Sequence, residues 1–90
     1  MRIVAVCGVG IGSSIILKKN AERALVELGL TATVDAISMA EVRRDSREAN
    51  IILTTVDLAQ LLDGIGPEII TIDHVIDKHE IKEKLAKALL

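Results

Sequence analysis

The chain has 90 residues, a length that suits one compact domain and is too short for a second hydrophobic core. It contains no Phe, Tyr or Trp, and its net charge is −2 with Lys and Arg scattered, which argues against nucleic-acid binding. The lone cysteine, Cys7, excludes an internal disulfide and paired-cysteine redox or zinc motifs, and indicates a reduced, intracellular protein.

The apolar N-terminus does not fit a targeting or membrane segment. Arg2 and the run IVAVCGVGIGSSIIL superficially resemble a signal peptide, but three glycines and two serines interrupt the run. The run is too short to span a bilayer and continues directly into the amphipathic pattern LKKNAERALVELG. We therefore expect no targeting segment and no direct membrane insertion.

Strand-like and helix-like segments alternate four times, without a repeat or a linker. The run from Ile3 to Cys7 is continuous and rich in β-branched residues, as expected of a strand buried on both faces. A helix is predicted from about residue 14 to residue 28, and Gly29 is a typical glycine after a helix end. The apolar residues at helical spacing are Leu17, Ala21, Ala24, Leu25 and Leu28.

A second strand and a short charged helix follow. The strand is predicted from Thr31 to Ile37. Ser38 and Glu41 then fit a capping box, the pattern in which a serine and a glutamate three residues later bond each other's backbone N–H groups. This pattern predicts a helix that reaches about Glu48.

The second half of the chain repeats the alternation twice. The predicted strands are apolar runs, and glycines or a proline mark the turns between elements. In order we expect a strand from Asn50 to Thr54, a helix over residues 56–62 that ends at Gly64, a strand over residues 68–72 and a helix over residues 77–90.

Strands that alternate with helices pair in parallel, because parallel strands need crossover connections. With right-handed crossovers, the strand order 2-1-3-4 places the first helix on one face and the second and third on the other. The last helix is free to return beside the first, which would close both faces. The predicted fold class is α/β, a three-layer sandwich with a four-stranded parallel sheet in a single domain, residues 1–90.

Ligands of such sheets bind beyond the carboxyl ends of the strands, where the strand order reverses. That point coincides with the loop that follows Cys7.

The octapeptide CGVGIGSS, which Cys7 opens, carries the pattern that predicts a site. Gly8, Gly10 and Gly12 permit a positive φ and a close approach of the backbone to a ligand. The backbone N–H groups, the start of the following helix and the two serine hydroxyls can together hold a phosphate. The same positive helix end stabilises a thiolate on Cys7. The alternative is a small buried cysteine in front of a tight turn.

Three known phosphate loops differ from this one. A dinucleotide-binding GxGxxG motif requires a glycine where Ser13 stands, although Asp35 follows at a suggestive distance, and the Walker pattern GxxxxGK[ST] does not occur. The C-x5-R-[ST] loop of low-molecular-weight cysteine phosphatases and arsenate reductases has an arginine in place of Ser13. We therefore predict a phosphoryl carrier. The alternatives are a phosphatase or arsenate-reductase-like enzyme and, third, a non-catalytic anion-binding module.

The motif from Cys7 to Ser14 and the helix IILKKNAERALVELG after it resemble a known family. They are similar to the enzyme IIB component of the bacterial phosphoenolpyruvate-dependent sugar phosphotransferase system. Within its lactose, ascorbate and galactitol group, the spacing C-G-x-G-x-G-S-S looks most like the ascorbate-type branch. The specific resemblance covers about Val4 to Leu30, and the remainder agrees in length and in the order of strands and helices.

The resemblance implies a phosphotransferase with a phosphocysteine intermediate. Cys7 would accept phosphate from the phosphohistidine of a phosphorylated IIA protein, and a IIC membrane transporter would pass it to the incoming sugar, of the ascorbate-like or the pentitol or hexitol class. The protein would be cytoplasmic and would associate with that transporter, and we expect no cofactor and no metal. The residues implied to cradle the phosphoryl group are Gly8, Val9, Gly10, Ile11, Gly12, Ser13 and Ser14.

A second group of polar residues follows the last predicted strand. His74 is expected at the same edge of the sheet as Cys7, where it could contact a phosphate or a partner, or be an ordinary loop residue. Asp73, His74, Asp77 and His79 match no familiar metal-site spacing, and the last two open a helix, where Asp is a good cap.

The remaining polar candidates have structural explanations. Lys18 and Lys19 are close enough to the loop to attract a phosphorylated partner, although surface lysines need no such role. Asp35 fits either a site or the edge of the sheet. We expect a solvated face for Arg43, Arg44 and Arg47, and helix-capping or helix-dipole roles for Thr55 and Asp57.

Overall fold

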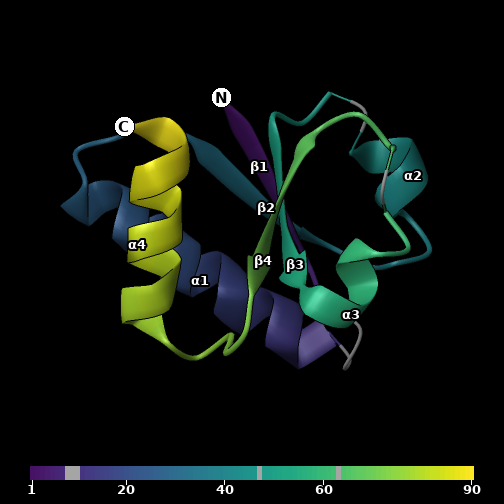
Figure 1. Ribbon diagram of the computed structural model, residues 1–90, viewed down its shortest axis with the longest axis horizontal. Helices are drawn as coiled ribbons and strands as arrows, with labels where there is room; N and C mark the ends of the chain where they lie inside the picture. The colour runs from purple at the N-terminus through teal and green to yellow at the C-terminus, as the bar shows by residue number, and fades with distance from the viewer. Residues whose placement is uncertain (8–10, 47, 63) are drawn as a thin grey trace.

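In the computed structural model, helices cover both faces of a four-stranded sheet (Figure 1). The structure describes residues 1–7, 11–46, 48–62 and 64–90, with the backbone alone for residues 11–13 and 43. In chain order the elements are β1 (Arg2–Val6), α1 (Ile11–Glu27), β2 (Thr33–Ile37), α2 (Val42–Asp45), β3 (Ile51–Thr55), α3 (Val56–Ala59), β4 (Glu68–Ile72) and α4 (Lys78–Leu89).

All strand pairs of the sheet are parallel, and the strand order is β2-β1-β3-β4. Val4 of β1 lies opposite Asp35 of β2 on one side and Ile52 of β3 on the other. From β1 the chain first adds β2 on one side and then β3 and β4 on the other side, so the strand order reverses between β1 and β3. The predicted position of this reversal is confirmed. The α/β class and the order 2-1-3-4 are confirmed with it.

Alternate residues of each strand enter two separate hydrophobic cores, because successive side chains of a strand point to opposite faces. Ile3 and Ala5 face α1 and α4, whereas Val4 and Val6 face α2 and α3, and all four are fully buried. Figure 1 shows α1 with α4 on one side of the sheet and α2 with α3 on the other. The crossover rule predicted the faces of α1, α2 and α3, and α4 lies beside α1, as expected for closing both faces.

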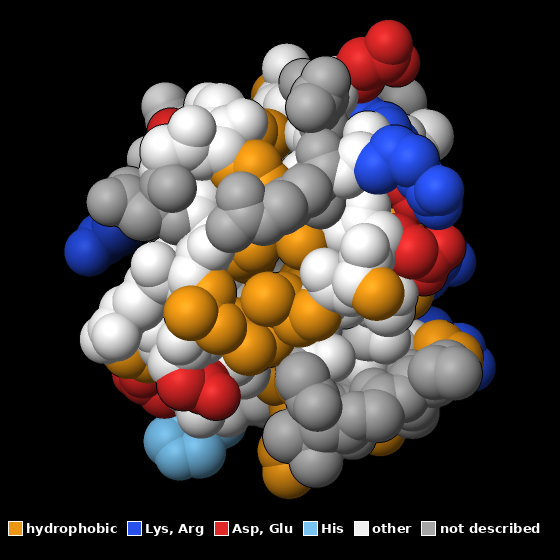
Figure 2. Space-filling view, turned by 90° about the vertical axis from the view of Figure 1, so that its right-hand side faces the viewer, with side chains coloured by type: hydrophobic (Ala, Val, Ile, Leu, Met, Phe, Trp, Pro, Cys, Tyr) orange, Lys and Arg blue, Asp and Glu red, His pale blue; other side chains and the backbone are white. Residues whose placement is uncertain are grey.

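The side that carries α2 and α3 is only partly covered. Each of these helices has four residues, so a hollow of about 510 Å³ remains beside α3. Apolar side chains gather at the centre of this face in the space-filling view (Figure 2). The hollow is lined by Val56, Ala59, Gln60, Ile69 and Thr71.

The helix α1 begins at Ile11, three residues earlier than predicted, and ends at Glu27, one residue before the predicted end. Its first turn therefore includes Gly12, which the sequence placed in the loop. At the other end Gly29 has φ +71°, the left-handed conformation that glycine adopts without strain. The N–H of Leu30 donates to the carbonyl of Leu25 (2.9 Å) and the N–H of Gly29 to that of Val26 (3.1 Å). Together these two bonds form the Schellman motif, a common helix end.

The helix α2 is much shorter than predicted. Glu41 Oε1 accepts hydrogen bonds from the hydroxyl (2.8 Å) and the N–H (3.4 Å) of Ser38, so half of the capping box forms. The helix starts only at Val42, after a turn, and the side chain of its N-cap residue Glu41 makes no capping bond. The hydroxyl and the N–H of Ser46 both donate to the Val42 carbonyl. A serine hydroxyl that competes for a helix carbonyl favours an end there, which explains why the helix does not reach Glu48.

The helix α3 also ends earlier than the predicted Leu62. After Ala59 the chain continues in tighter turns, in which the N–H of Leu61 donates to Leu58 (2.9 Å) and that of Leu62 to Ala59 (3.2 Å). Such bonds between residues three apart are typical of the last turn of a helix. Leu62 is nevertheless buried in the core, although it lies outside the helix.

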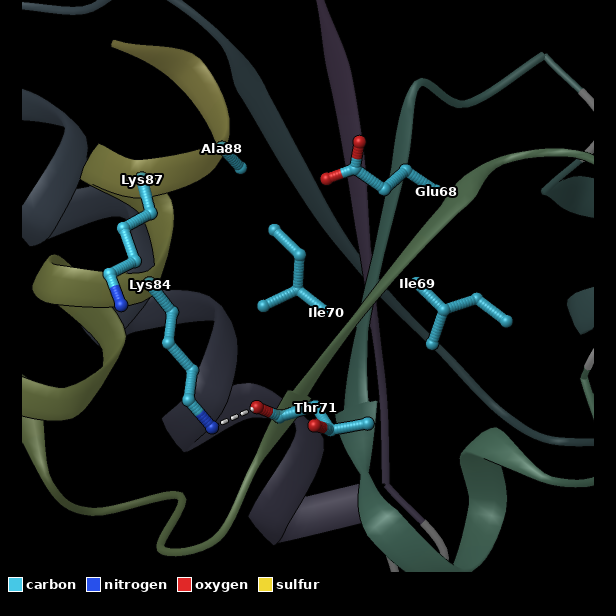
Figure 3. A pocket seen from close by; sticks show the side chains of 7 residues that line it. All are labelled: Glu68, Ile69, Ile70, Thr71, Lys84, Lys87 and Ala88. Carbon is cyan, nitrogen blue, oxygen red and sulfur yellow. Dashed lines mark hydrogen bonds between the residues drawn. The ribbon is translucent and has the colours of Figure 1, made fainter.

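The open edge of β4 lies beside α4, with a groove of about 360 Å³ between them (Figure 3). The ammonium of Lys84 reaches across this groove and donates to the carbonyl of Thr71. Lys84 is also 2.9 Å from Glu80 Oε2. A lysine over an edge strand blocks pairing with a strand of another molecule. The groove therefore has a structural explanation, and Cys7 does not line it.

Candidate functional site

The sheet places Cys7 at its carboxyl edge. Cys7 is the first residue after β1, next to the switch point between β1 and β3, and its residue surface is 7% exposed. The structure thus places the thiol at the end of the sheet where ligands of parallel α/β folds bind. A reactant must come against this edge to reach it.

The predicted phosphate-binding residues are divided between the described and undescribed parts of the chain. Gly8, Val9 and Gly10 lie outside the described residues. The other four, Ile11, Gly12, Ser13 and Ser14, form the first turn of α1.

The first turn of α1 has the backbone groups that an anion needs. The first four N–H groups of a helix lack partners within the helix, and they carry the positive end of its dipole. No acidic side chain occupies this turn to compete with a bound anion. Ser14 is buried, and it lies on the same face of α1 as the core residue Leu17. The turn can therefore hold a phosphoryl group by its backbone.

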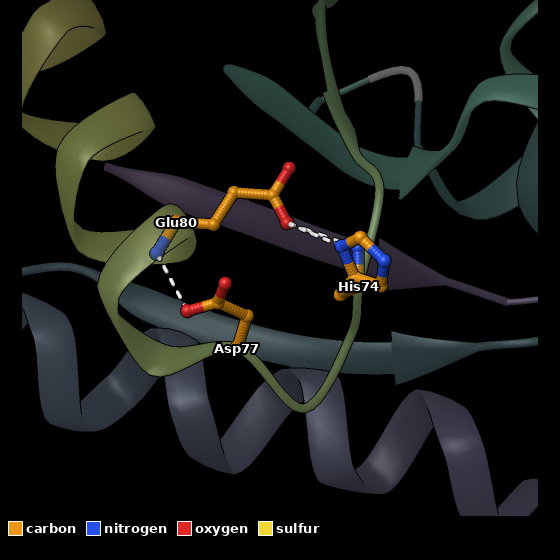
Figure 4. Close-up of side chains that lie close together, drawn as sticks. All are labelled: His74, Asp77 and Glu80. Atoms are coloured by element: carbon orange, nitrogen blue, oxygen red, sulfur yellow. Dashed lines mark hydrogen bonds and ion pairs between the residues drawn. The ribbon is translucent and has the colours of Figure 1, made fainter.

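The loop between β4 and α4 reaches the same edge, and one carboxylate holds it (Figure 4). Glu80 accepts the N–H of Asp73 at Oε2 (2.7 Å) and the N–H of His74 at Oε1 (2.9 Å), and Lys84 lies beside it. Partial burial of the carboxyl group raises its pKa. The N–H of Asp73, the Lys84 ammonium and the N–H of His74 outweigh this effect and lower the pKa of Glu80 to about 2.

Two further contacts fix the same loop. The side-chain amide of Asn20 on α1 donates to the carbonyl of Val75 (3.0 Å). Asp77 caps α4, since its Oδ1 accepts the N–H groups of His79 (3.0 Å) and Glu80 (3.1 Å). The loop is therefore held by both long helices, while the side chain of His74 is 76% exposed.

Ligand atoms of His74, Asp77 and Glu80 lie within 4.8 Å of one another. This group differs from the set considered in the sequence, because Glu80 joins it and His79 turns to Glu83 on its own helix (2.9 Å). The oxygens of Asp77 and Glu80 already accept backbone N–H groups. The cluster is thus explained by the folding of the loop.

The structure assigns Asp35 to the sheet. Its Oδ2 is 3.1 Å from Nε of Arg2, and Nη1 of Arg2 donates to the carbonyl of Asp45 (2.9 Å). Arg2 begins β1, so this contact points to the amino edge of the sheet, away from Cys7. Both side chains are at the surface, where such a pair adds little stability.

The lysine and arginine candidates whose side chains the structure describes also lie at the surface. Lys18 is 3.4 Å from Glu22, one turn further along α1. Arg44 is 78% exposed and pairs with Glu41 and Asp45, as expected of a solvated face. Of the other two arginines, Arg43 is described by its backbone alone and Arg47 lies outside the described residues.

The residues at the end of β3 and the start of α3 have the structural roles that the sequence indicated, with one difference. Thr55 occupies the N-cap position of α3 in an extended conformation, but its side chain makes no capping bond. Its hydroxyl bonds Asp57 instead and is the main cause that lowers the pKa of Asp57; the N–H groups of Asp57 and Leu58 also lower it. Thr54 is fully buried, and its hydroxyl has no hydrogen-bond partner among the described residues.

Sequence reasoning missed Glu80 and Asn20. Asp77 and Glu80 have the D-x-x-E spacing of a capping box, and this spacing could have indicated that both side chains bind backbone N–H groups at the start of a helix. The partners of Glu80 could not be inferred, because they lie six and seven residues before it in a loop. The contact of Asn20 with Val75 joins positions 55 residues apart, so no local pattern indicates it.

A comparison with protein families decides the identity of the chain. The family model described as "PTS system, Lactose/Cellobiose specific IIB subunit" matches residues 2–87. The chain belongs to this family. The predicted resemblance is confirmed, and it extends from the segment between Val4 and Leu30 to nearly the whole chain. PTS IIB components are phosphotransferases of sugar uptake that work with IIA and IIC partners.

Individual relatives agree with this assignment. The ascorbate-specific PTS system EIIB component of Mycoplasma pneumoniae is 33% identical over 90 residues, with 99% of this chain and 95% of that protein covered. The corresponding component of Shigella dysenteriae serotype 1 is 27% identical, with 99% and 89% covered. These relatives support the ascorbate-type branch within the IIB family.

A solved structure agrees with the fold. The lactose-specific IIB domain of Streptococcus pneumoniae superposes with a TM-score of 0.71 at 11% identity, with 99% of this chain and 94% of that chain covered. At this identity the likeness concerns the fold alone. Among the described residues, none of the helices has both the length and the apolar character needed to cross a bilayer.

Proposed function

We propose that this IIB protein is a phosphoryl carrier that uses Cys7 as its acceptor. The phosphoryl group comes from a phosphohistidine of a IIA protein and leaves to a sugar that a IIC transporter imports. The observation that carries the proposal is the position of the lone cysteine, directly in front of the N-terminal turn of α1, in a chain whose residues 2–87 match the IIB family. Residues 1–90 then act as one IIB domain, in the cytoplasm and beside the transporter.

The chemistry of the first transfer follows from this arrangement. The Cys7 thiolate attacks the phosphorus atom in line with the P–N bond, an S–P bond forms, and the imidazole nitrogen leaves with the electron pair and takes a proton. The N–H groups from Gly8 to Ser14 would hold the phosphoryl oxygens, and the positive end of α1 stabilises first the thiolate and then the phosphate. The second transfer reverses the role of sulfur, which becomes the leaving group when a sugar hydroxyl attacks.

The position of Ser13 argues against hydrolysis. Low-molecular-weight cysteine phosphatases have an arginine at this place, and its planar guanidinium holds the phosphoryl oxygens during transfer to water. A carrier benefits from lacking this group, because it must keep the phosphoryl group until the next acceptor arrives. Steady hydrolysis of p-nitrophenyl phosphate that depends on Cys7 would support the phosphatase alternative and contradict the carrier.

The sugar we propose is ascorbate, because the relatives of Mycoplasma pneumoniae and Shigella dysenteriae are named as ascorbate-specific components. A pentitol or hexitol is the alternative class. Membranes that contain the cognate IIC transporter, supplied with the phosphorylated protein, should form the phosphate ester of ascorbate faster than that of a pentitol or hexitol. Preferential phosphorylation of a polyol would replace this part of the proposal.

The central experiment is intact-mass analysis after incubation with phosphoenolpyruvate, the general transfer proteins and a IIA protein. We expect one phosphoryl adduct on the wild type and none on Cys7→Ser. His74→Gln and His79→Gln are matched controls, since both histidines are exposed, and both variants should keep the adduct. An adduct on either histidine, or none with any IIA protein, contradicts the proposal.

A further inference from the structure

Exposed aliphatic side chains gather at the edge of the sheet that carries Cys7. Four of the eight large hydrophobic residues that the described chain exposes come from segments at this edge. Two lie in the second turn of α1, one begins α3, and one belongs to the loop after β4. These residues are Ile15, Ile16, Val56 and Ile76.

Ile16 and Ile76 belong to one connected part of this edge. Asn20, one turn after Ile16 on the same side of α1, donates its side-chain amide to the carbonyl of Val75, the residue before Ile76. The helix and the loop are thus joined by a hydrogen bond from a buried side chain, since Asn20 is 9% exposed. Ile76 nevertheless remains 71% exposed.

The loop that carries Ile76 is held in one conformation. Glu80 binds its first two N–H groups, Asn20 binds the carbonyl of Val75, and the N–H of Asp77 donates to the carbonyl of His74 (2.9 Å). A partner that contacts Ile76 need not order the loop, so little conformational entropy is lost on binding.

Charged side chains also lie beside these residues. Lys18 on α1 lies 3.4 Å from Glu22, whereas Lys19, three residues after Ile16, and Lys78, two residues after Ile76, are exposed. The contact area for a partner therefore combines aliphatic side chains with charged groups. A partner that presents apolar side chains around a phosphoryl group complements such a surface.

We propose that Ile16 and Ile76 form the docking contact for the phosphorylated IIA donor. This inference rests on the proposed function. Because Cys7 is only 7% exposed, a donor whose phosphate is attached to a histidine must bring its own surface against the carboxyl edge of the sheet. Both isoleucines lie on elements that reach this edge, and their burial supplies the binding energy for a transient complex.

The test is the rate of phosphoryl transfer from phosphorylated IIA to Cys7 at increasing IIA concentration, for the wild type, Ile16→Ser and Ile76→Ser. Each substitution should raise the KM for IIA by about fivefold or more, the effect of losing one important interface side chain, and leave the maximal rate unchanged. Val26→Ser is the matched control. Val26 is 79% exposed on the same helix, and its distance of about 15 Å from Ile16 along the axis should leave its KM unchanged.

Two further measurements separate docking from other effects. The rate of alkylation of Cys7 by iodoacetamide and the unfolding midpoint should match the wild type in all three variants, because the substituted side chains are exposed. The affinity for unphosphorylated IIA, measured by calorimetry, should fall with Ile16→Ser and Ile76→Ser.

The outcomes distinguish the two proposals. A wild-type KM and IIA affinity in both isoleucine variants overturns the docking contact and leaves the carrier function intact. An effect confined to transfer from Cys7 to the transporter also overturns it, because the surface then serves the IIC protein. Absence of both phosphorylation and IIA binding in the wild type overturns the carrier function and the docking contact together.

Discussion

Glu80 shows how one side chain can shape the edge of the sheet that carries the site. Its carboxylate is 13% exposed and accepts two backbone N–H groups of the loop after β4, in addition to the Lys84 ammonium. These partners favour the charged form of the group and hold its pKa near 2, below the ordinary value of 4.5. The carboxylate is thus linked both to the stability of the fold and to the loop that presents Ile76.

We predict that Glu80→Gln lowers the free energy of unfolding at pH 7 by about 1.5–3 kcal/mol, the range for hydrogen bonds to a charged group. The folded-state pKa is depressed, so the contribution of Glu80 is fully present above about pH 4.5 and is lost as the pH falls through about 2. The difference between wild type and variant should therefore shrink below pH 4.5.

Urea unfolding at pH 7, 4.5 and 3 measures this difference. Glu83→Gln is the matched control on the same helix, because the side chain of Glu83 is 66% exposed and pairs only with His79 among the described residues. Its effect should stay within about 0.5 kcal/mol. Equal losses in the two variants at pH 7 would contradict the role assigned to Glu80.

At the scale of the element, the end of α1 is specified by local chemistry. Gly29 takes φ +71°, and the two hydrogen bonds of the Schellman motif close the helix around it. Leu30 then packs against the core that contains Leu25, the apolar contact that commonly accompanies this motif. The chain is thereby turned back toward β2, the edge strand beside β1.

We expect Gly29→Ala to destabilise the protein by about 1–2 kcal/mol, because an L-residue is strained in the left-handed region. A Cβ at this position would meet nothing within 4 Å, so the loss comes from the backbone and not from a clash. Thermal and urea unfolding measure it. Lys19→Ala, at an exposed position within α1, should change the stability by less than about 0.5 kcal/mol, and a neutral Gly29→Ala would refute the explanation.

At the scale of the whole molecule, the two faces of the sheet are unequally covered. One face is covered by α1 and α4, with 17 and 12 residues, and the other by α2 and α3, with four residues each. Two buried residues of α4, Ile81 and Leu85, enter the larger core. By contrast, Val42 and Leu58 are the residues that α2 and α3 place in the smaller core.

This asymmetry predicts unequal local stability. Backbone amides of α2 and α3 should exchange with solvent through local openings, at least about tenfold faster than those of α1 and α4, because few buried contacts oppose such openings. Native-state hydrogen exchange followed by NMR measures the difference. Amides around Ile81 and Leu85 are the internal reference, and equal protection on the two faces would show that the short helices open only with the whole fold.

Much of this architecture could be predicted because its signals are local. The strand from Glu68 to Ile72 has the predicted ends, since Gly66 and Pro67 mark its start and its apolar run is unambiguous. The short helices were predicted too long because their ends depend on other groups. Ser46 takes the carbonyl of Val42, and the chain after Ala59 tightens into turns that bury Leu62.

The candidate site could also be predicted only in part: the sequence indicated where the cysteine lies, but not the contacts that hold the neighbouring loop. The place of Cys7 at the carboxyl edge of the sheet follows from the strand that precedes it, although this strand ends at Val6, one residue earlier than predicted. Its chemical role and the phosphate contacts from Gly8 to Ser14 stay predictions, with Gly8, Val9 and Gly10 outside the described residues. The bonds that Glu80 and Asn20 make to the loop after β4 join different elements, so their spacing in the chain carried no information about them.

The sequence by itself determined the alternation of strands and helices, the parallel order of the sheet, and the placement of a lone cysteine before a helix N-terminus. These features depend on local patterns, namely apolar periodicity and glycine positions, together with the general rules for crossovers between parallel strands. Only the tertiary structure decided where α2 and α3 end and which helices hold the loop after β4. It also decided which aliphatic side chains remain exposed at the edge beside Cys7. These features depend on contacts between distant residues, and such contacts exist only once the sheet has brought its carboxyl ends together.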